Sequence, residues 1–216
     1  MRRRFELILR YLFMNFYYQI EMFVVEMADK YDEKGKKILD VGAGTGKHKE
    51  YFKKISYTAC DVSQNKERTI DIVGDFIDEP KKFKKEDYDY VLCIQVLEHF
   101  TDPKTAFSHF NRVLKPGGRL FLTTNFIYQT HMEPVDYFRF TKYGLNLLGE
   151  KNGFKVERVK PQGGIFSVLV YVLVTLPLRL GLEKNKWLYY LYLVIFSPVI
   201  ILGNLLAVFL DKFDRE

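Results

Sequence analysis

The chain has 216 residues, of which 48% are hydrophobic and 28% are charged, with a formal net charge of +6. This composition allows one α/β domain with an appendage and excludes a largely disordered chain. The basic excess favours contact with anionic lipid or nucleic acid, although ordinary solubility gives the same balance. Cys60 and Cys93 lie in apolar, strand-like runs without a C-x-x-C spacing. They therefore argue against a disulfide framework or a zinc site, and for a reducing compartment.

Residues 1–35 have apolar side chains dense on one face of a helix, which predicts an N-terminal amphipathic helix. The basic start resembles the first part of a signal peptide. Glu6, Arg10 and Glu21 interrupt the apolar run, and no small-residue cleavage site follows. We therefore interpret the segment as an amphipathic helix and reject a signal peptide.

Residues 36–162 alternate short apolar runs with helical patterns, which is typical of βαβ units around a parallel sheet. A helix is expected after Pro103, which suits a first helical turn, and a turn at 116–118 leads into the next strand. The six predicted strands are residues 37–43, 57–62, 69–75, 88–95, 118–126 and 154–161.

Residues 163–216 form a C-terminal segment of different composition, with apolar runs at 163–178 and 187–210 separated by the charged "RLGLEKNK". A helix of the 24 uncharged residues 187–210 would be about 36 Å long, enough for a hydrocarbon core of about 30 Å. The shorter run suits an interfacial or re-entrant helix. Among spanning arrangements, one span over 187–210 keeps the basic residues of 179–186 inside. The alternative is a pair of soluble helices that form a lid or a dimer interface.

The stretch "KKILDVGAGTGKHKEYF" leads from an apolar strand into a loop with Gly42, Gly44 and Gly46 at every second position. A P-loop fails here because position 41 is Val and position 48 is His. The dinucleotide fingerprint G-x-G-x-x-G also fails, because its third glycine position holds Lys47. A purely structural turn stays open on these residues alone.

Carboxylates follow successive predicted strands, where open α/β sheets bind their ligands. Asp40 ends the first strand, and Asp61 ends the second at the distance suited to a ribose diol. Asp75 follows the third, where its carboxylate can accept a hydrogen bond from an adenine amino group with Phe76 beside the ring. The fourth strand ends at Gln95. Three acids around one adenosine would repel a pyrophosphate and attract the sulfonium and amino groups of S-adenosylmethionine.

With these features, residues 36–159 resemble the class I S-adenosylmethionine-dependent methyltransferases. "ILDVGAGTGKH", "ACDVS", "VGDF", "YDYVLCIQVLEHFTDP" and "LKPGGRLFLTT" look like five family motifs in order. The resemblance implies an α/β fold, a Rossmann-like sheet with helices on both faces, and S-adenosylmethionine as cofactor. It places the glycine-loop backbone near the methionine portion, Asp40 at its amino group directly or through water, and an adenine contact at "VGDF". The expected cofactor-binding residues are Asp40, Gly42, Ala43, Gly44, Gly46, Asp61, Val62, Asp75, Phe76 and Gln95.

A narrower resemblance lies in "HMEPVDYFRFTKYGLNLLGEKNGFKVERV", which is similar to a segment of methyltransferases linked to surface-glycan or lipid-linked pathways. In that family the chain continues with one more strand, so either this sequence is a fragment or its edge strand is lost. Tyr137 and Arg139 are the expected substrate-binding residues, as an aromatic wall and an anion clamp. The alternative is a structural Arg139–Asp136 pair with Tyr137 and Phe138 in the core.

His99 and His131 are the candidate catalytic bases if the acceptor atom is a hydroxyl oxygen. His99 could instead cap the following helix or pack against the cofactor ribose. Glu98 with His99 also resembles the pair that holds magnesium in some quinone and small-RNA methyltransferases. Because Gln95 replaces the upstream glutamate of that pattern, no metal site is expected.

The sequence therefore predicts an S-adenosylmethionine-dependent methyltransferase acting on a small or amphipathic acceptor: a lipid-linked sugar, a glycan precursor or a quinone-like lipid. It would be cytoplasmic, with possible attachment to the cytoplasmic membrane face through residues 163–210. One alternative is a non-catalytic cofactor-binding membrane adaptor. Another is an RNA methyltransferase, although the lysines of "KKFKKED" are mixed with acids and no RNA-binding module is recognisable, which makes nucleic acid an unlikely partner.

Overall fold

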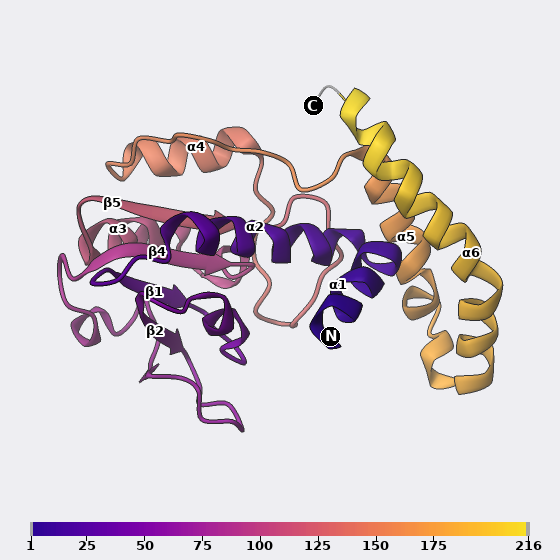
Figure 1. The fold of residues 1–216 in the computed structure, drawn as a ribbon, viewed down its shortest axis with the longest axis horizontal. Coiled ribbons are helices and arrows are strands. Elements are labelled where there is room, and N and C mark those ends of the chain that lie inside the picture. The colour runs from indigo at the N-terminus through magenta and orange to yellow at the C-terminus, as the bar shows by residue number, and fades with distance from the viewer. Residues whose placement is uncertain (1, 215–216) are drawn as a thin grey trace. The chain divides into compact units, whose positions relative to one another are not determined.

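The computed structural model describes residues 2–214 (Figure 1). The chain divides into two compact units, one from Val24 to Lys160 and one that combines residues up to Phe23 with those from Pro161 onward. The second boundary lies within two residues of the predicted one at 162/163. The N-terminal residues, which the sequence analysis set apart, share a unit with the C-terminal segment.

The helices and strands follow the expected alternation over the Val24–Lys160 unit. Short 3₁₀ turns occur at Lys47–Tyr51, Pro80–Lys82, Leu97–His99, Leu182–Lys184 and Asp211–Phe213. The longer elements are α1 (Arg2–Phe13), α2 (Asn15–Tyr31), β1 (Lys37–Val41), β2 (Ser56–Asp61), β3 (Ile72–Val73), β4 (Tyr88–Ile94), α3 (Pro103–Val113), β5 (Leu114–Thr123), α4 (Lys142–Lys151), α5 (Ile165–Arg179) and α6 (Lys186–Leu210).

The five strands form one parallel sheet in the order β3-β2-β1-β4-β5, which confirms the predicted Rossmann-like sheet. The chain winds outward from β1 to β3 and then crosses back to β4 on the other side. The strand order therefore reverses between β1 and β4, and such a switch point opens a crevice at the carboxyl ends of the strands. The fold places the predicted site there.

Both faces of the sheet are covered, as a parallel sheet requires. Every residue of β4 is buried. Val91 and Cys93 point into a core that includes Phe107 and Phe110 of α3. On the opposite face, the ring of Tyr31, near the end of α2, lies 5.2 Å from that of Tyr90. The α3 helix begins as predicted, because the Asp102 carboxylate accepts hydrogen bonds from the first-turn amides.

The predicted sixth strand at 154–161 is wrong, because the structure assigns no strand anywhere between residues 152 and 164. Alternating apolar residues suggested a strand, but a strand also needs ladder hydrogen bonds to a sheet edge. Here Glu157 pairs with Arg119 of β5 through side chains, at 2.5 Å. The third strand is shorter than predicted, with only Ile72 and Val73 paired.

The single predicted helix over 1–35 is interrupted at Met14, between α1 and α2. Two of the charged residues that break the apolar pattern pair with each other, Arg10 of α1 with Glu21 of α2 at 3.1 Å. Glu21 is buried, so the pair removes an uncompensated charge.

Helices α5 and α6 form an antiparallel hairpin, seen in orange and yellow in Figure 1. The α5 amide groups of Ile165 and Phe166 donate to the carboxylates of Asp214 and Asp211, which follow α6, at 2.7 and 3.0 Å. The start of α5 therefore lies at the end of α6. This arrangement does not support the single span over 187–210, which would put these two ends on opposite sides of a membrane.

Candidate active site

The glycine loop lies between β1 and the 3₁₀ turn at Lys47–Tyr51, at the carboxyl edge of the sheet. Gly42 has φ +72°, and a Cβ there would collide with the Val96 side chain. Gly44 has φ +57°, and a Cβ there would meet no atom within 4 Å. The first glycine is thus needed for packing against the segment after β4. The second leaves an open surface that a ligand can approach closely.

Asp61, at the end of β2, is joined to this loop. Its Oδ2 accepts a hydrogen bond from the Gly44 amide at 2.8 Å. Val62 beside it is 67% exposed. The structure therefore brings together the loop, the acid predicted for the ribose and an apolar side chain able to contact a base.

Asp75 lies after β3, and its Oδ1 accepts hydrogen bonds from the amides of Ile77 and Asp78 at 2.7 and 3.0 Å. The tight turn that these bonds close directs Phe76 into the core. Phe76 is 2% exposed and stacks on Phe110 with ring centroids 5.1 Å apart. The Phe76 ring therefore faces the core and not the crevice in this conformation, which does not support the predicted contact with an adenine ring.

Asp40 differs from the prediction as well. Its carboxylate is 1% exposed, accepts a short hydrogen bond from the Tyr57 hydroxyl, and lies 3.4 Å from Nδ1 of His48. Burial and the neighbouring Asp40 charge raise the pKa of Tyr57, so the phenol remains a donor. This burial does not support a direct contact of Asp40 with the cofactor amino group, and the contact through water stays a prediction. Its contacts fit a role in holding the start of the loop.

Gln95 and Glu98 shape the end of β4. Gln95 has φ +57°, a conformation that non-glycine residues rarely adopt, and its amide donates to the Thr123 hydroxyl at 3.1 Å. Glu98 is fully buried and accepts hydrogen bonds from Thr124 and Asn125 at 2.7 and 2.6 Å. Sequence analysis considered Glu98 only as a metal ligand. The structure shows that it joins the segments after β4 and β5.

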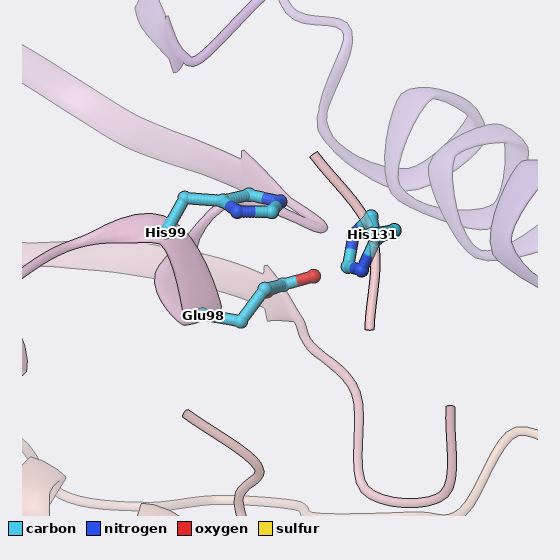
Figure 2. Close-up of side chains that lie close together, drawn as sticks. All are labelled: Glu98, His99 and His131. Atoms are coloured by element: carbon cyan, nitrogen blue, oxygen red, sulfur yellow. The ribbon is translucent and has the colours of Figure 1, made fainter. Parts of the chain in front are cut away.

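Figure 2 shows the imidazole rings of His99 and His131 converging with the Glu98 carboxylate. The ring centroids are 4.8 Å apart. His99 Nδ1 lies 2.5 Å from the Val135 carbonyl oxygen, and His131 Nδ1 lies 3.0 Å from Oδ2 of Asp136. Because both partners only accept, we assign the proton of each neutral ring to Nδ1. The Nε2 atoms are then acceptors. The three side chains could also hold a cation, because one ligand atom from each lies within 4.8 Å of the others.

Asp136 was not predicted as a partner of His131. Its side chain is 1% exposed, and both oxygens pair with the Arg139 guanidinium, at 2.6 and 2.7 Å. This ion pair holds the pKa of Asp136 well below its usual range, so the carboxylate stays charged beside His131. Arg139 also donates to the Tyr128 and Gln129 carbonyls. These contacts favour the structural Arg139–Asp136 pair over the anion clamp that we expected.

A family model described as "Methyltransferase domain" matches residues 10–159, more than half of the chain. The chain belongs to this methyltransferase family. Its open glycine loop, with Asp61 beside it, fits the S-adenosylmethionine that methyltransferases of this family use.

Among curated relatives, this methyltransferase is 30% identical over 103 residues to the ubiquinone biosynthesis O-methyltransferase of Klebsiella pneumoniae. The match covers 42% of the chain and 43% of the relative. The relative of the same name from Vibrio atlanticus is 28% identical over 103 residues, which cover 42% of this chain and 44% of the relative. The matched region thus spans less than half the length of these relatives.

Solved structures confirm the fold. A Bacillus halodurans C-125 protein assigned as a methyltransferase aligns with a TM-score of 0.51 and 21% identity, covering 62% of this chain and 70% of that one. Phosphoethanolamine N-methyltransferase 2 of Haemonchus contortus, solved with S-adenosyl-L-methionine, aligns with a TM-score of 0.50 and 21% identity. The alignment covers 73% of this chain and 41% of that one.

The loop between β5 and α4, which carries His131, exposes several large apolar side chains, which we call the apolar rim. Tyr137 is 46% exposed, which argues against the alternative that places it in the core. Its role as a wall for the acceptor stays a prediction. Large exposed apolar groups mark binding surfaces when they cluster. The other members of this rim are Phe126, Ile127, Met132, Val135 and Phe138.

The Asp136 ion pair predicts a pH-dependent contribution to stability. In the folded protein the pKa of Asp136 lies below its ordinary value of 3.8. The contribution of the ion pair to the unfolding free energy is therefore full above about pH 4, and it is lost as the pH falls through the pKa of Asp136 in the folded protein. Asp136→Asn should lower the unfolding free energy by roughly 1–3 kcal/mol at pH 7. Urea unfolding of both proteins from pH 7 to the acid limit measures this difference. A difference that persists undiminished at the acid limit would contradict the assignment, and the exposed Asp78→Asn serves as the control.

Proposed function

We propose that this methyltransferase modifies a hydroxyl oxygen of an amphipathic small molecule, such as a lipid-linked sugar, a glycan precursor or a quinone-like lipid. The enclosed Asp136 carboxylate beside His131, on a loop with exposed apolar side chains, is the observation that carries this proposal. A histidine oriented by a carboxylate suits proton removal, and the rim suits an acceptor with an apolar part. The curated relatives are named O-methyltransferases, which supports oxygen as the acceptor atom.

In the proposed mechanism, bound S-adenosylmethionine supplies an activated methyl group for in-line displacement. The Gly44 backbone and Asp61 hold the cofactor at the switch point. The rim residue Tyr137 positions the acceptor, and alignment of this kind can contribute about 7–11 kcal/mol to lowering a barrier. Nε2 of His131 takes the hydroxyl proton, and Asp136 stabilises the imidazolium that results. His99, whose ring contacts that of His131, borders the same space.

The test is incubation of the labelled cofactor with fractionated host extract, followed by mass analysis of the labelled product. We expect label in a lipid or glycan fraction, with His131→Ala as the matched inactive control. Label in the RNA fraction would overturn the acceptor assignment. Cofactor binding without turnover on any fraction would instead favour the adaptor interpretation.

A second candidate is a cation-assisted reaction, because Glu98, His99 and His131 could hold a metal ion. We favour the metal-free mechanism, since both Glu98 oxygens already accept protein hydrogen bonds. Activity should therefore remain within about twofold after treatment with a chelator, a change far smaller than the effect of losing a catalytic base. Loss of activity that a particular divalent ion restores would contradict this mechanism.

Membrane contact through residues 163–210 also belongs to the proposed function. Of the described residues, only Lys186–Phe213 form a helix long and apolar enough to cross a membrane. Only 17% of its most apolar 18-residue window is buried, which differs from the core helix of a soluble protein. An amphipathic acceptor would be met at a membrane surface, so the contact would bring enzyme and acceptor together.

A further inference from the structure

We propose that the α5–α6 hairpin is a monotopic membrane insert that lies along one bilayer face and enters only the near leaflet. The inference rests on the membrane contact in the proposed function. It adds that the hairpin contacts one lipid leaflet and specifies the topology of the hairpin in the membrane. It rests on three features of the unit that contains both helices: an apolar outer surface, the carbonyl partners at its prolines and the placement of its charges.

The outer surface of the hairpin is apolar along its length. On α6 the exposed large side chains recur every three or four residues, so they form a continuous stripe. No charged residue occurs between 187 and 210. The α6 stripe comprises Leu188, Leu191, Ile195, Val199, Leu202, Leu206 and Phe209, and α5 adds Ile165, Leu169 and Val172.

The two helix-breaking prolines show how the hairpin keeps its backbone satisfied. Pro177 cannot donate to the Leu173 carbonyl, and the Tyr192 hydroxyl donates to that oxygen instead, at 2.6 Å. Pro198 likewise leaves the Val194 carbonyl, which accepts from the Ser197 hydroxyl at 3.3 Å. Water would satisfy both carbonyls on a solvated helix, whereas hydrocarbon requires partners within the protein. This internal satisfaction fits lipid.

Charges lie at both ends of the hairpin, which decides its orientation. The tip between the helices carries Arg179, Glu183, Lys184 and Lys186, and the base carries Asp211, Lys212 and Asp214. The uncharged part of α5, residues 165–178, spans only about 21 Å, less than the hydrocarbon core of about 30 Å. In a perpendicular hairpin the longer α6 would carry Lys186 across the hydrocarbon, but the shorter α5 would leave Arg179 within it. Lying along the surface keeps both ends at headgroup level, with the net positive tip near anionic lipid.

Flotation of the full-length protein with phosphatidylcholine vesicles, with and without phosphatidylglycerol, tests membrane binding. We expect the wild type to float, more strongly with the anionic lipid. Leu202→Asp should reduce the floated fraction about tenfold or more, whereas Leu147→Asp on α4 should leave it unchanged. The two leucines are matched in exposure, at 58% and 52%. A wild-type dimer that stays with the solvent fraction, and that Leu202→Asp converts to monomers, would make the stripe a self-association surface and overturn the proposal.

Thiol labelling tests the topology. Cys60 and Cys93 are buried, so they contribute little background. Lys184→Cys at the tip and Lys212→Cys at the base should react equally with an impermeant maleimide added outside sealed vesicles. Protection of Lys184→Cys until detergent is added would show a spanning hairpin and overturn the monotopic assignment. Both assays are independent of turnover, so failure of methyl transfer would leave their results intact.

Discussion

Asp61→Ala is expected to weaken the binding of S-adenosylmethionine by roughly 100-fold, or about 3 kcal/mol. Hydrogen bonds to a charged carboxylate contribute about 1.5–3 kcal/mol each, and the substitution also frees the Gly44 amide that Asp61 holds. Calorimetric titration measures the dissociation constant directly.

Two further variants separate the direct effect of Asp61 from other causes. Asp61→Asn keeps one oxygen for the Gly44 amide, so it should lose less affinity than the alanine variant. Asp78→Ala removes an exposed carboxylate from the next loop and should bind like the wild type. An unchanged constant for Asp61→Ala would reject the ribose assignment.

His131→Ala is expected to lower kcat by about 10² to 10⁴-fold while the affinity for the cofactor stays near that of the wild type. This is the usual contribution of a general base, and His131 is the histidine whose Nδ1 proton faces a carboxylate. His109→Ala is the matched control, because that ring lies on α3 against the Phe76 carbonyl. Turnover is measured on the acceptor that the labelling experiment identifies.

The pH profile distinguishes proton removal from a structural role. If His131 is the base, the wild-type rate should rise with pH as the ring becomes free to accept a proton, and this dependence should be absent from the residual rate of His131→Ala. His99→Ala should reduce the rate less and retain the dependence. Full activity in both histidine variants would remove the base proposal.

Much of the fold could be predicted because local sequence determined it. The β1 strand, the glycine loop and the acid at the end of β2 are close in sequence, and their spacing fixes their meeting at one sheet edge. The α3 helix was equally local, with Asp102 as its cap and Pro103 in its first turn. The alternation of apolar residues could not decide whether residues 154–161 form a strand, because strand pairing depends on a sheet edge formed elsewhere in the chain.

The parts of the site that sequence analysis missed depend on turns and on contacts distant in sequence. Phe76 follows Asp75, but the bonds that Asp75 makes to its own turn decide that the ring faces the core. Asp40 was placed correctly on its strand, yet only the fold shows that Tyr57 encloses it. The His131–Asp136 pair had no signal of its own, since Asp136 was considered only as a partner of Arg139.

The most direct test of the account is a crystal structure with S-adenosylhomocysteine, the demethylated cofactor. We predict the ribose hydroxyls on Asp61, the adenine between Val62 and Asp75, and the sulfur directed toward His131. A ligand bound away from the β1–β4 switch point, or a pyrophosphate compound held by the glycine loop in its place, would contradict the assignment of this edge as the methyl-transfer site.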